Sequence, residues 1–227
     1  MKKVFAFIFV RGGSKGLPKK NLLSFGGKPL FTHAIELAKQ IKEIERIFVS
    51  TDSREIMDIA IKHKAEVIPR PKELAADNSP EIGAWRHAIS FLKDQGEEDY
   101  IFLSLPATSP LRNSTDVTCC INALDEHTDG VITVTPASRN PYFNMVSRDD
   151  DGSSSILLSS ENLYRRQDAP AVYDITTVAY VSRPKFILQN DSLFEGSLKS
   201  VIVPKERAID IDDYLDFKFA EFLFETN

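Results

Sequence analysis

The sequence predicts one α/β domain over 1–227, with a mostly parallel sheet covered by helices on both faces. Strand-like and helix-like patterns alternate along the chain, which favours parallel strands joined by crossover helices. Residues 3–10 form a nearly continuous apolar run, as expected for a strand that is buried on both faces. A length of 227 residues and a hydrophobic content of 42% fit one large domain that buries a substantial core.

The alternating elements can be assigned in order. The expected strands lie at 3–10, 47–50, 66–68, 99–104 and 130–135. The expected helices lie at 30–42, about 53–63, 80–94 and 114–126. The second of these helices begins after Asp52 or Ser53, and either is a suitable N-cap because its side chain can accept a backbone N–H of the first turn.

The alternation stops at Pro136. The segment 137–172 is largely polar, carries an Asp-Asp-Asp-Gly turn at 149–152 and contains only short apolar pieces. We interpret this segment as an inserted, hairpin-like arm that acts as a lid or as a dimerisation arm.

Regular patterns return after the insertion. Strands are expected at 175–181 and 200–203, followed by a final helix. In that helix Leu215, Phe219 and Phe222 share one apolar stripe, which is typical of a helix that packs on a core.

Composition excludes several classes of protein. The net charge of −5 and the pI of about 5.5 argue against a general nucleic-acid binder, which needs a broad basic face. The first apolar run ends at Arg11, where a signal peptide needs a small-residue cleavage site, and no run reaches the length of a membrane span. The adjacent Cys119 and Cys120 offer neither a disulfide framework nor metal-ligand spacing. We therefore expect a cytoplasmic protein without a membrane partner.

Cations are concentrated in the loop that leaves the first strand. Arg11, Lys15, Lys19 and Lys20 lie there beside Gly12 and Gly13, in an otherwise acidic protein. In parallel α/β sheets ligands bind beyond the carboxyl ends of the strands, and glycines let backbone N–H groups approach an anion. The loop is neither a Walker A nor a GxGxxG motif. It is either an anion site or a solvated basic loop.

A pair of carboxylates precedes the final helix. Asp210 and Asp212 are two residues apart in an extended piece, so both side chains are expected on one side of the chain. Mg²⁺ favours sites of one or two carboxylates that phosphate and water complete. The alternative is that an aspartate only caps the helix, a role that suits Asp212 or Asp213.

Six segments together resemble the acylneuraminate cytidylyltransferases, the CMP-sialic acid synthetases. They occur in family order over nearly the whole chain. The segments are VRGGSKGLPKKN (10–21), STDS (50–53), RPKELAADNS (70–79), LPATSPLR (105–112), RRQDAPAVY (165–173) and ERAIDIDDYLD (206–216). Each segment alone is weak evidence, but the combination is highly specific.

The resemblance implies a Rossmann-like nucleotidyltransferase fold, usually a homodimer, with the inserted arm reaching the partner. The implied reaction joins CTP and a 2-keto-3-deoxy sugar acid to give a CMP-sugar and pyrophosphate, with Mg²⁺. The implied nucleotide-binding residues are Arg11, Gly12, Gly13, Ser14, Lys15, Lys20, Asn21, Arg70 and Ser79. The expected substrate-binding residues are Thr108, Ser109, Arg165 and Tyr180, of which Arg165 would meet the sugar carboxylate from the arm. For Tyr180 the alternative is that it only follows the alternation of side chains along its strand. Arg11, Lys20 and Asp212 would act in catalysis, and Asp210 with Asp212 would bind the metal.

Three positions depart from the family pattern. Pro106 stands where glutamine is common, 176–178 read Thr-Thr-Val where Asn-Gly-Ala is common, and Glu81 replaces a small polar residue near the cytosine. The first two departures leave the acceptor open among sialic, legionaminic, pseudaminic and other nonulosonic acids. An enzyme for an eight-carbon ulosonate and a non-catalytic nucleotide-binding module remain as alternatives. The opening loop lacks the ARxxSTRLPGK pattern of the former.

Overall fold

A computed structural model describes residues 3–14, 16–158 and 165–226. The strands are β1 (Val4–Phe9), β2 (Ser24–Phe25), β3 (Lys28–Pro29), β4 (Ile44–Thr51), β5 (Glu66–Pro69), β6 (Ile101–Ser104), β7 (Gly130–Pro136), β8 (Val146–Arg148), β9 (Ser154–Ile156), β10 (Tyr173–Ser182) and β11 (Leu198–Ile202). The α-helices are α1 (Thr32–Gln40), α2 (Arg54–Lys62), α3 (Glu81–Lys93), α4 (Ser114–Ala123), α5 (Pro184–Gln189) and α6 (Tyr214–Thr226). Each expected strand and helix is present, with ends that shift by up to three residues.

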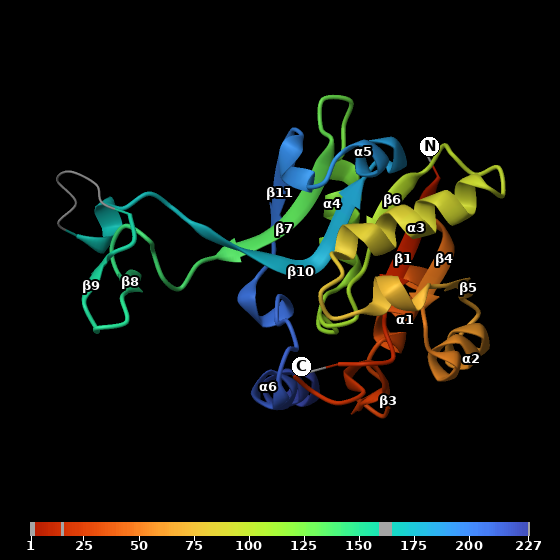
Figure 1. Cartoon of the computed structure of the whole chain (residues 1–227), viewed down its shortest axis with the longest axis horizontal. Coiled ribbons are helices and arrows are strands. Elements are labelled where there is room, and N and C mark those ends of the chain that lie inside the picture. The colour runs from red at the N-terminus through yellow and green to blue at the C-terminus, as the bar shows by residue number, and fades with distance from the viewer. Residues whose placement is uncertain (1–2, 15, 159–164, 227) are drawn as a thin grey trace.

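The main sheet of the described chain has seven strands in the order β11-β7-β10-β6-β1-β4-β5 (Figure 1). Strand β10 runs antiparallel to both of its neighbours, and the other pairings are parallel. The prediction of a mostly parallel sheet is therefore confirmed. Because parallel neighbours end at the same edge, the loops after β1, β5 and β6 are brought together there.

Helices cover both faces of this sheet. Along β1, Val4, Ala6 and Ile8 pack with α1, α2 and α4, whereas Phe5 and Phe7 pack with α3 and α5. Side chains alternate across a strand, so one apolar run supplies both cores. This is why β1 reads as continuously hydrophobic. Ser53 caps α2 by accepting the backbone N–H of Ile56 at 3.5 Å, so the structure decides between the two predicted caps.

A third, smaller core lies under α6. It joins Phe25 and Leu30 of the β2–β3 hairpin to Ile211, Phe217 and Ala220. The apolar stripe that the sequence indicates on the last helix does not face this core. Its members are exposed, with fractions of 75% for Leu215, 49% for Phe219 and 60% for Phe222.

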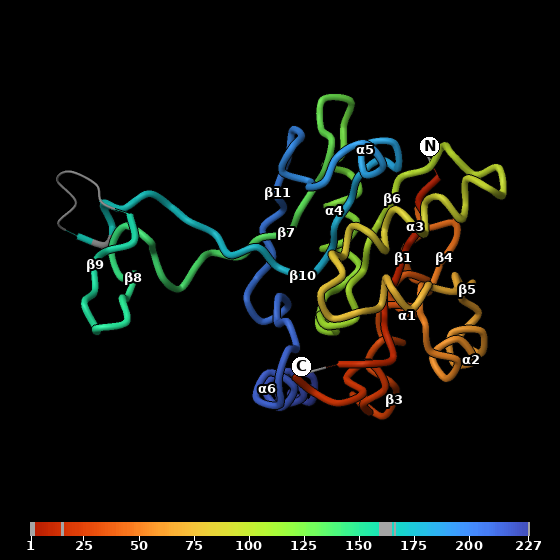
Figure 2. Tube along the Cα trace, in the orientation of Figure 1, coloured from red at the N-terminus to blue at the C-terminus, as the bar shows by residue number. Residues whose placement is uncertain are grey.

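The inserted arm extends away from the body of the domain. Figure 2 shows the chain leaving after β7, turning through β8 and β9, and returning along β10. Strands β8 and β9 pair antiparallel and form a hairpin within this segment. No helix in the described part of the chain combines the length and apolar character needed to cross a bilayer.

Candidate active site

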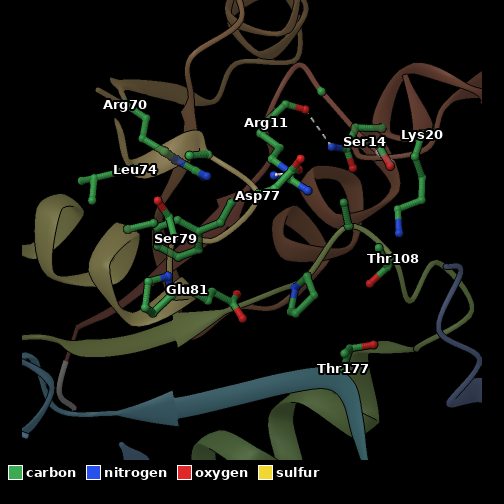
Figure 3. Close-up of a pocket in the computed structure, with 18 of the residues that line it drawn as sticks. Arg11, Ser14, Lys20, Arg70, Leu74, Asp77, Ser79, Glu81, Thr108 and Thr177 are labelled. Carbon is green, nitrogen blue, oxygen red and sulfur yellow. Dashed lines mark hydrogen bonds and ion pairs between the residues drawn. The ribbon is translucent and has the colours of Figure 1, made fainter. Parts of the chain in front are cut away.

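A cavity of ≈ 370 Å³ opens at the carboxyl ends of the parallel strands. Its walls come from the loop after β1, the segment after β5, the turn after β6, β10 and the segment before α6. Several predicted site residues line it: Arg11, Gly13, Ser14, Lys20, Asn21, Arg70, Ser79, Thr108, Asp210 and Asp212. The topology thus brings together motifs that are far apart in the sequence (Figure 3).

The opening loop is anchored at both ends. The backbone N–H of Gly12 donates to Oδ1 of Asp52 at 3.0 Å, and Nδ2 of Asn21 donates to the carbonyl of Arg11 at 3.1 Å. Gly12 therefore anchors the loop instead of lining the cavity. Nη1 of Arg11 lies 2.6 Å from Oδ1 of Asp77 on the segment after β5, so an ion pair bridges two walls. Lys15 lies outside the described residues.

Lys20 joins this loop to the acidic segment. Its ammonium donates to the carbonyl of Ile211 at 2.6 Å and to Oδ1 of Asp212 at 3.0 Å. The two segments approach so closely at Gly16 that an added Cβ would stand 2.6 Å from the backbone oxygen of Asp212. Lys19 adopts a positive φ of 52°, which turns the chain just before Lys20.

Asp210 and Asp212 both line the cavity, but their surroundings differ. Oδ1 of Asp210 is buried and accepts no hydrogen bond from any described residue, while Thr108 and Thr177 bond to this carboxylate. Burial raises the pKa of Asp210, and these hydroxyls oppose that shift. The Asp212 side chain is 75% exposed.

The residue that caps α6 is Asp213, not Asp212. Oδ1 of Asp213 accepts the backbone N–H groups of Leu215 at 2.8 Å and Asp216 at 3.0 Å. Oδ2 of Asp216 accepts the backbone N–H of Asp213 at 3.1 Å in return, which completes a capping box. The Asp212 carboxylate is therefore left facing the cavity and Lys20.

Arg70 and Glu81 occupy the other end of the cavity. Arg70 donates to the hydroxyl of Ser50 at 3.1 Å and to its carbonyl at 2.6 Å, and its guanidinium lies 5.6 Å from the ring centre of Phe9. Burial lowers the pKa of Arg70 to about 10. Oε1 of Glu81 accepts the indole N–H of Trp85 at 3.2 Å. Glu81 keeps exposed surface, yet the chain around its carboxyl removes part of its hydration and raises its pKa.

Three predicted substrate-binding residues do not line this cavity. Ser109 is fully buried, and its hydroxyl lies 2.6 Å from that of Thr177, so it positions a cavity residue instead. Tyr180 is half-buried, and its ring packs with its centre 5.7 Å from that of Trp85. Arg165 is exposed on the arm, where it pairs with Asp168 at 3.3 Å.

The motif reading assigned no role at the cavity to Asp77 or Thr177, and treated Glu81 only as a departure. Asp77 pairs with Arg11, and Thr177 bonds to Asp210. The sequence indicated a site for an anionic ligand from its cations, and this criterion does not select carboxylates at the same site. Both Asp77 and Glu81 stand within four residues of Ser79, and this proximity was the available signal.

The arrangement suits a polyanion and a divalent cation. Lys20, Arg11 and the hydroxyl of Ser14 face a region that Asp210 and Asp212 border. Among the described residues, no three His, Cys, Asp or Glu side chains form a metal-binding group. A divalent ion held here thus needs ligands from a bound phosphate or from water.

Comparison with known proteins gives a consistent picture. The family model for cytidylyltransferases matches residues 5–224. The chain is 35% identical to the post-translational flagellin modification protein B of Campylobacter coli, over 99% of this chain and 96% of that protein. It is 34% identical to the CMP-N,N'-diacetyllegionaminic acid synthase of Campylobacter jejuni, over 98% and 95% of the two chains.

Solved structures share the fold. A CMP:2-keto-3-deoxy-manno-octonic acid synthetase complexed with CTP superposes with a TM-score of 0.76 at 16% identity, over 99% of each chain. A 4-diphosphocytidyl-2C-methyl-D-erythritol synthase superposes with a TM-score of 0.69 at 12% identity, again over 99% of each chain. These likenesses support the Rossmann-like α/β assignment.

Proposed function

The chain belongs to the cytidylyltransferase family, and we propose that it transfers CMP from CTP to a nonulosonic, sialic-acid-like sugar acid. In this reaction the anomeric hydroxyl of the sugar attacks the α-phosphorus of CTP. The bond from that phosphorus to the bridging oxygen breaks, pyrophosphate leaves, and the hydroxyl proton passes to solvent or a base. The observation that carries the proposal is the cavity that sets Lys20 and the opening loop against Asp210 and Asp212.

Positioning and charge neutralisation are the main demands of this chemistry. Arg11, Ser14 and Lys20 supply cationic and hydroxyl donors for the triphosphate. The anchoring of the loop through Gly12 and Asn21 holds those donors in place before the nucleotide binds. No nucleophilic side chain is required, because the acceptor hydroxyl is itself the nucleophile.

We propose Asp210 and Asp212 as the protein ligands for Mg²⁺. The buried Oδ1 of Asp210 has no hydrogen-bond partner among the described residues and fits a hard cation, and Asp212 lines the same cavity. When bound, Mg²⁺ lowers the charge on the phosphates and assists loss of the hydroxyl proton. Thr108 and Thr177 orient the Asp210 carboxylate, and Lys20 orients that of Asp212.

The end of the cavity proposed to hold the sugar acid is lined by Pro106, Thr108 and Thr177. Relatives of the chain are named for several acceptors. They include the legionaminic acid synthase, an N-acylneuraminate cytidylyltransferase of Streptococcus agalactiae at 30% identity over 95% of this chain, and a pseudaminic acid cytidylyltransferase of Campylobacter jejuni at 28% over 99%. These names favour a nine-carbon ulosonic acid over an eight-carbon one.

We further propose a homodimer in which the arm contacts the partner. The arm carries exposed apolar side chains with exposed fractions of 38% to 56%, a pattern typical of an interaction surface. They are Phe143, Met145, Val146, Ile156, Leu157 and Leu158. Arg165 lies on the same arm and does not line the cavity of its own chain. In the proposed dimer it would serve the cavity of the partner.

A reducing compartment, the cytoplasm, suits the two thiols. Cys119 and Cys120 are both free, and burial raises the pKa of the Cys120 thiol to about 12, which makes it unreactive.

The test is a pyrophosphate-release assay with CTP, Mg²⁺ and a panel of ulosonic acids. Release with one or more nine-carbon acids, and much less with ATP, GTP or UTP, is the expected result. Release only with an eight-carbon ulosonate would favour the alternative acceptor. Tight nucleotide binding with no release for any acceptor would identify a non-catalytic module.

A further inference from the structure

Glu81 carries a hydrogen-bond acceptor that the proposed reaction does not yet use. Oε1 is held by the indole N–H of Trp85 at 3.2 Å, and no described residue donates to Oε2. Trp85 is itself 95% removed from solvent, since only 5% of its surface is exposed, and it packs 5.2 Å from Phe102. A buried donor therefore holds one oxygen of a carboxylate that lines the cavity, and the second oxygen remains available to a ligand.

The surroundings of Glu81 suit a flat ring. Phe9, Leu74 and Ala84 provide apolar walls at this end of the cavity. Figure 3 shows Arg70, Leu74 and Glu81 on the side of the cavity away from Lys20. A nucleotide whose phosphates lie at Lys20 thus places its base between Arg70 and Glu81.

Charge distinguishes the two polar groups at this end. Arg70 uses Nε and Nη2 on Ser50, which leaves Nη1 as a donor toward the cavity. Its positive charge stabilises the ionised Glu81 carboxyl and opposes the upward pKa shift that desolvation causes. The base site therefore offers a donor at Arg70 and an acceptor at Glu81.

We infer that Oε2 of Glu81, held in place by Trp85, accepts the N4 amino group of cytosine and so excludes uracil. This inference rests on the proposed function and assigns its base specificity. Cytosine has an amino donor where uracil has the O4 acceptor, and both bases carry O2, which Arg70 can bind. Arg70 thus binds either pyrimidine, whereas a carboxylate opposite O4 leaves two acceptors facing each other. Trp85 is a positioning residue that acts through Glu81.

The decisive comparison uses CTP and UTP with one acceptor. Glu81→Gln keeps an oxygen for Trp85 and turns an amide N–H₂ toward the base. We expect the ratio of kcat/KM for CTP over UTP to fall about tenfold or more. The change should arise from a raised KM for CTP and a lowered KM for UTP, with kcat for CTP nearly unchanged. Glu73→Gln is the matched control, because Glu73 lies outside the cavity lining and should leave the ratio unchanged.

Trp85→Phe tests the positioning role. Phenylalanine preserves most of the packing but has no N–H for Oε1, so the CTP preference should fall in the same direction and by less. Direct titration of CMP and UMP into wild-type protein and the Glu81→Gln variant reports the same selectivity without turnover. Circular dichroism confirms that each variant is folded.

Failure of the base-reading role of Glu81 can be distinguished from failure of the proposed function. If wild-type protein releases pyrophosphate from CTP but Glu81→Gln keeps the wild-type CTP-to-UTP ratio, the base-reading role is overturned and the proposed function stands. If no acceptor supports release, the proposed function fails. In that case equal CMP and UMP affinities in wild-type protein would overturn the base-reading role, and a CMP preference lost in Glu81→Gln would support it.

Discussion

The ammonium of Lys20 lies 3.0 Å from Oδ1 of Asp212, although 192 positions separate the two residues. This contact joins the opening loop to the segment before α6 at the edge of the cavity. Only 13% of the Lys20 side chain is exposed, so its charge acts where water screens it weakly. In the absence of ligand Asp212 partly neutralises this lysine, and a bound triphosphate offers it a stronger anionic partner.

Replacing Lys20 by alanine should lower kcat by about 100-fold or more, since removing one transition-state charge contact typically costs a few kcal/mol. Steady-state pyrophosphate release measures the effect. Lys19→Ala is the matched control, because the Lys19 side chain is 71% exposed and pairs with Glu55 at 3.7 Å, away from the cavity lining. Equal activities of Lys20→Ala and Lys19→Ala would indicate that the opening loop is only a solvated basic loop.

Neighbouring aspartates before α6 should give opposite phenotypes. Asp212→Asn should remove most turnover and leave the melting temperature within a few degrees, because this side chain caps no helix. Asp213→Ala should keep turnover and lower the melting temperature by about 2–4 °C, since losing an N-cap costs about 1 kcal/mol. Thermal scans and turnover on both variants test the pair. An Asp212→Asn protein that unfolds, or one that keeps full activity with an unchanged Mg²⁺ dependence, would refute metal binding by this residue.

Chelation of divalent ions should abolish activity without unfolding the protein. Two carboxylates without a third described ligand bind Mg²⁺ firmly only when phosphate completes the site, so the ion contributes little to the stability of the free protein. Activity with EDTA, circular dichroism, and recovery on adding Mg²⁺ provide the measurement. Full activity in excess EDTA would remove the metal from the proposal.

Many of the predicted site residues line one cavity because their motifs follow strand ends. Arg11 follows β1, Arg70 follows β5 and Thr108 follows β6, and a parallel sheet brings those ends to one edge. Ser109 shows the limit of this reasoning. It adjoins Thr108 in the same turn, but neighbouring side chains point in different directions, and that of Ser109 is buried against Thr177.

The last helix shows a second limit. Periodicity found an apolar stripe at Leu215, Phe219 and Phe222, but α6 also carries Phe217 and Ala220 on another side, and these are the residues that pack inward. The β2–β3 hairpin determines which of the two stripes of α6 packs inward. Its strands have only two residues each. Strands this short have no readable alternation, so the surface that receives α6 was not visible in the pattern.

His33 should make the stability of the protein depend on pH. Its pKa is lowered below 6.5, chiefly by burial among Phe25 and Phe224, despite its hydrogen bond with the carbonyl of Phe25. The unfolded chain therefore binds a proton more readily, and stability that is present above pH 6.5 is lost as the pH falls through that value. The melting temperature of wild-type protein should fall between pH 7.5 and about 5.5 by an amount that His33→Gln reduces. His127→Gln, at a side chain that is 86% exposed, should retain the wild-type dependence, and identical pH profiles for all three proteins would contradict the assignment.

Arg165→Ala should raise the KM for the sugar acid and leave the KM for CTP nearly unchanged, because a lost carboxylate contact weakens binding of the acceptor alone. If the arm serves the partner's cavity, mixing this variant with Lys20→Ala should restore activity. The assay uses a sugar-acid concentration well below the raised KM, at which the Arg165→Ala dimer alone is slow. One site of each mixed dimer has an intact Lys20 and an intact Arg165, so a fully exchanged 1:1 mixture should reach about a quarter of the wild-type rate under these conditions. Mixing Arg165→Ala with wild-type protein inactivated by heat is the control and should restore nothing. A mixture no more active than the mean of the two variants, in protein shown to be dimeric and exchanging subunits, would place Arg165 outside the partner's site.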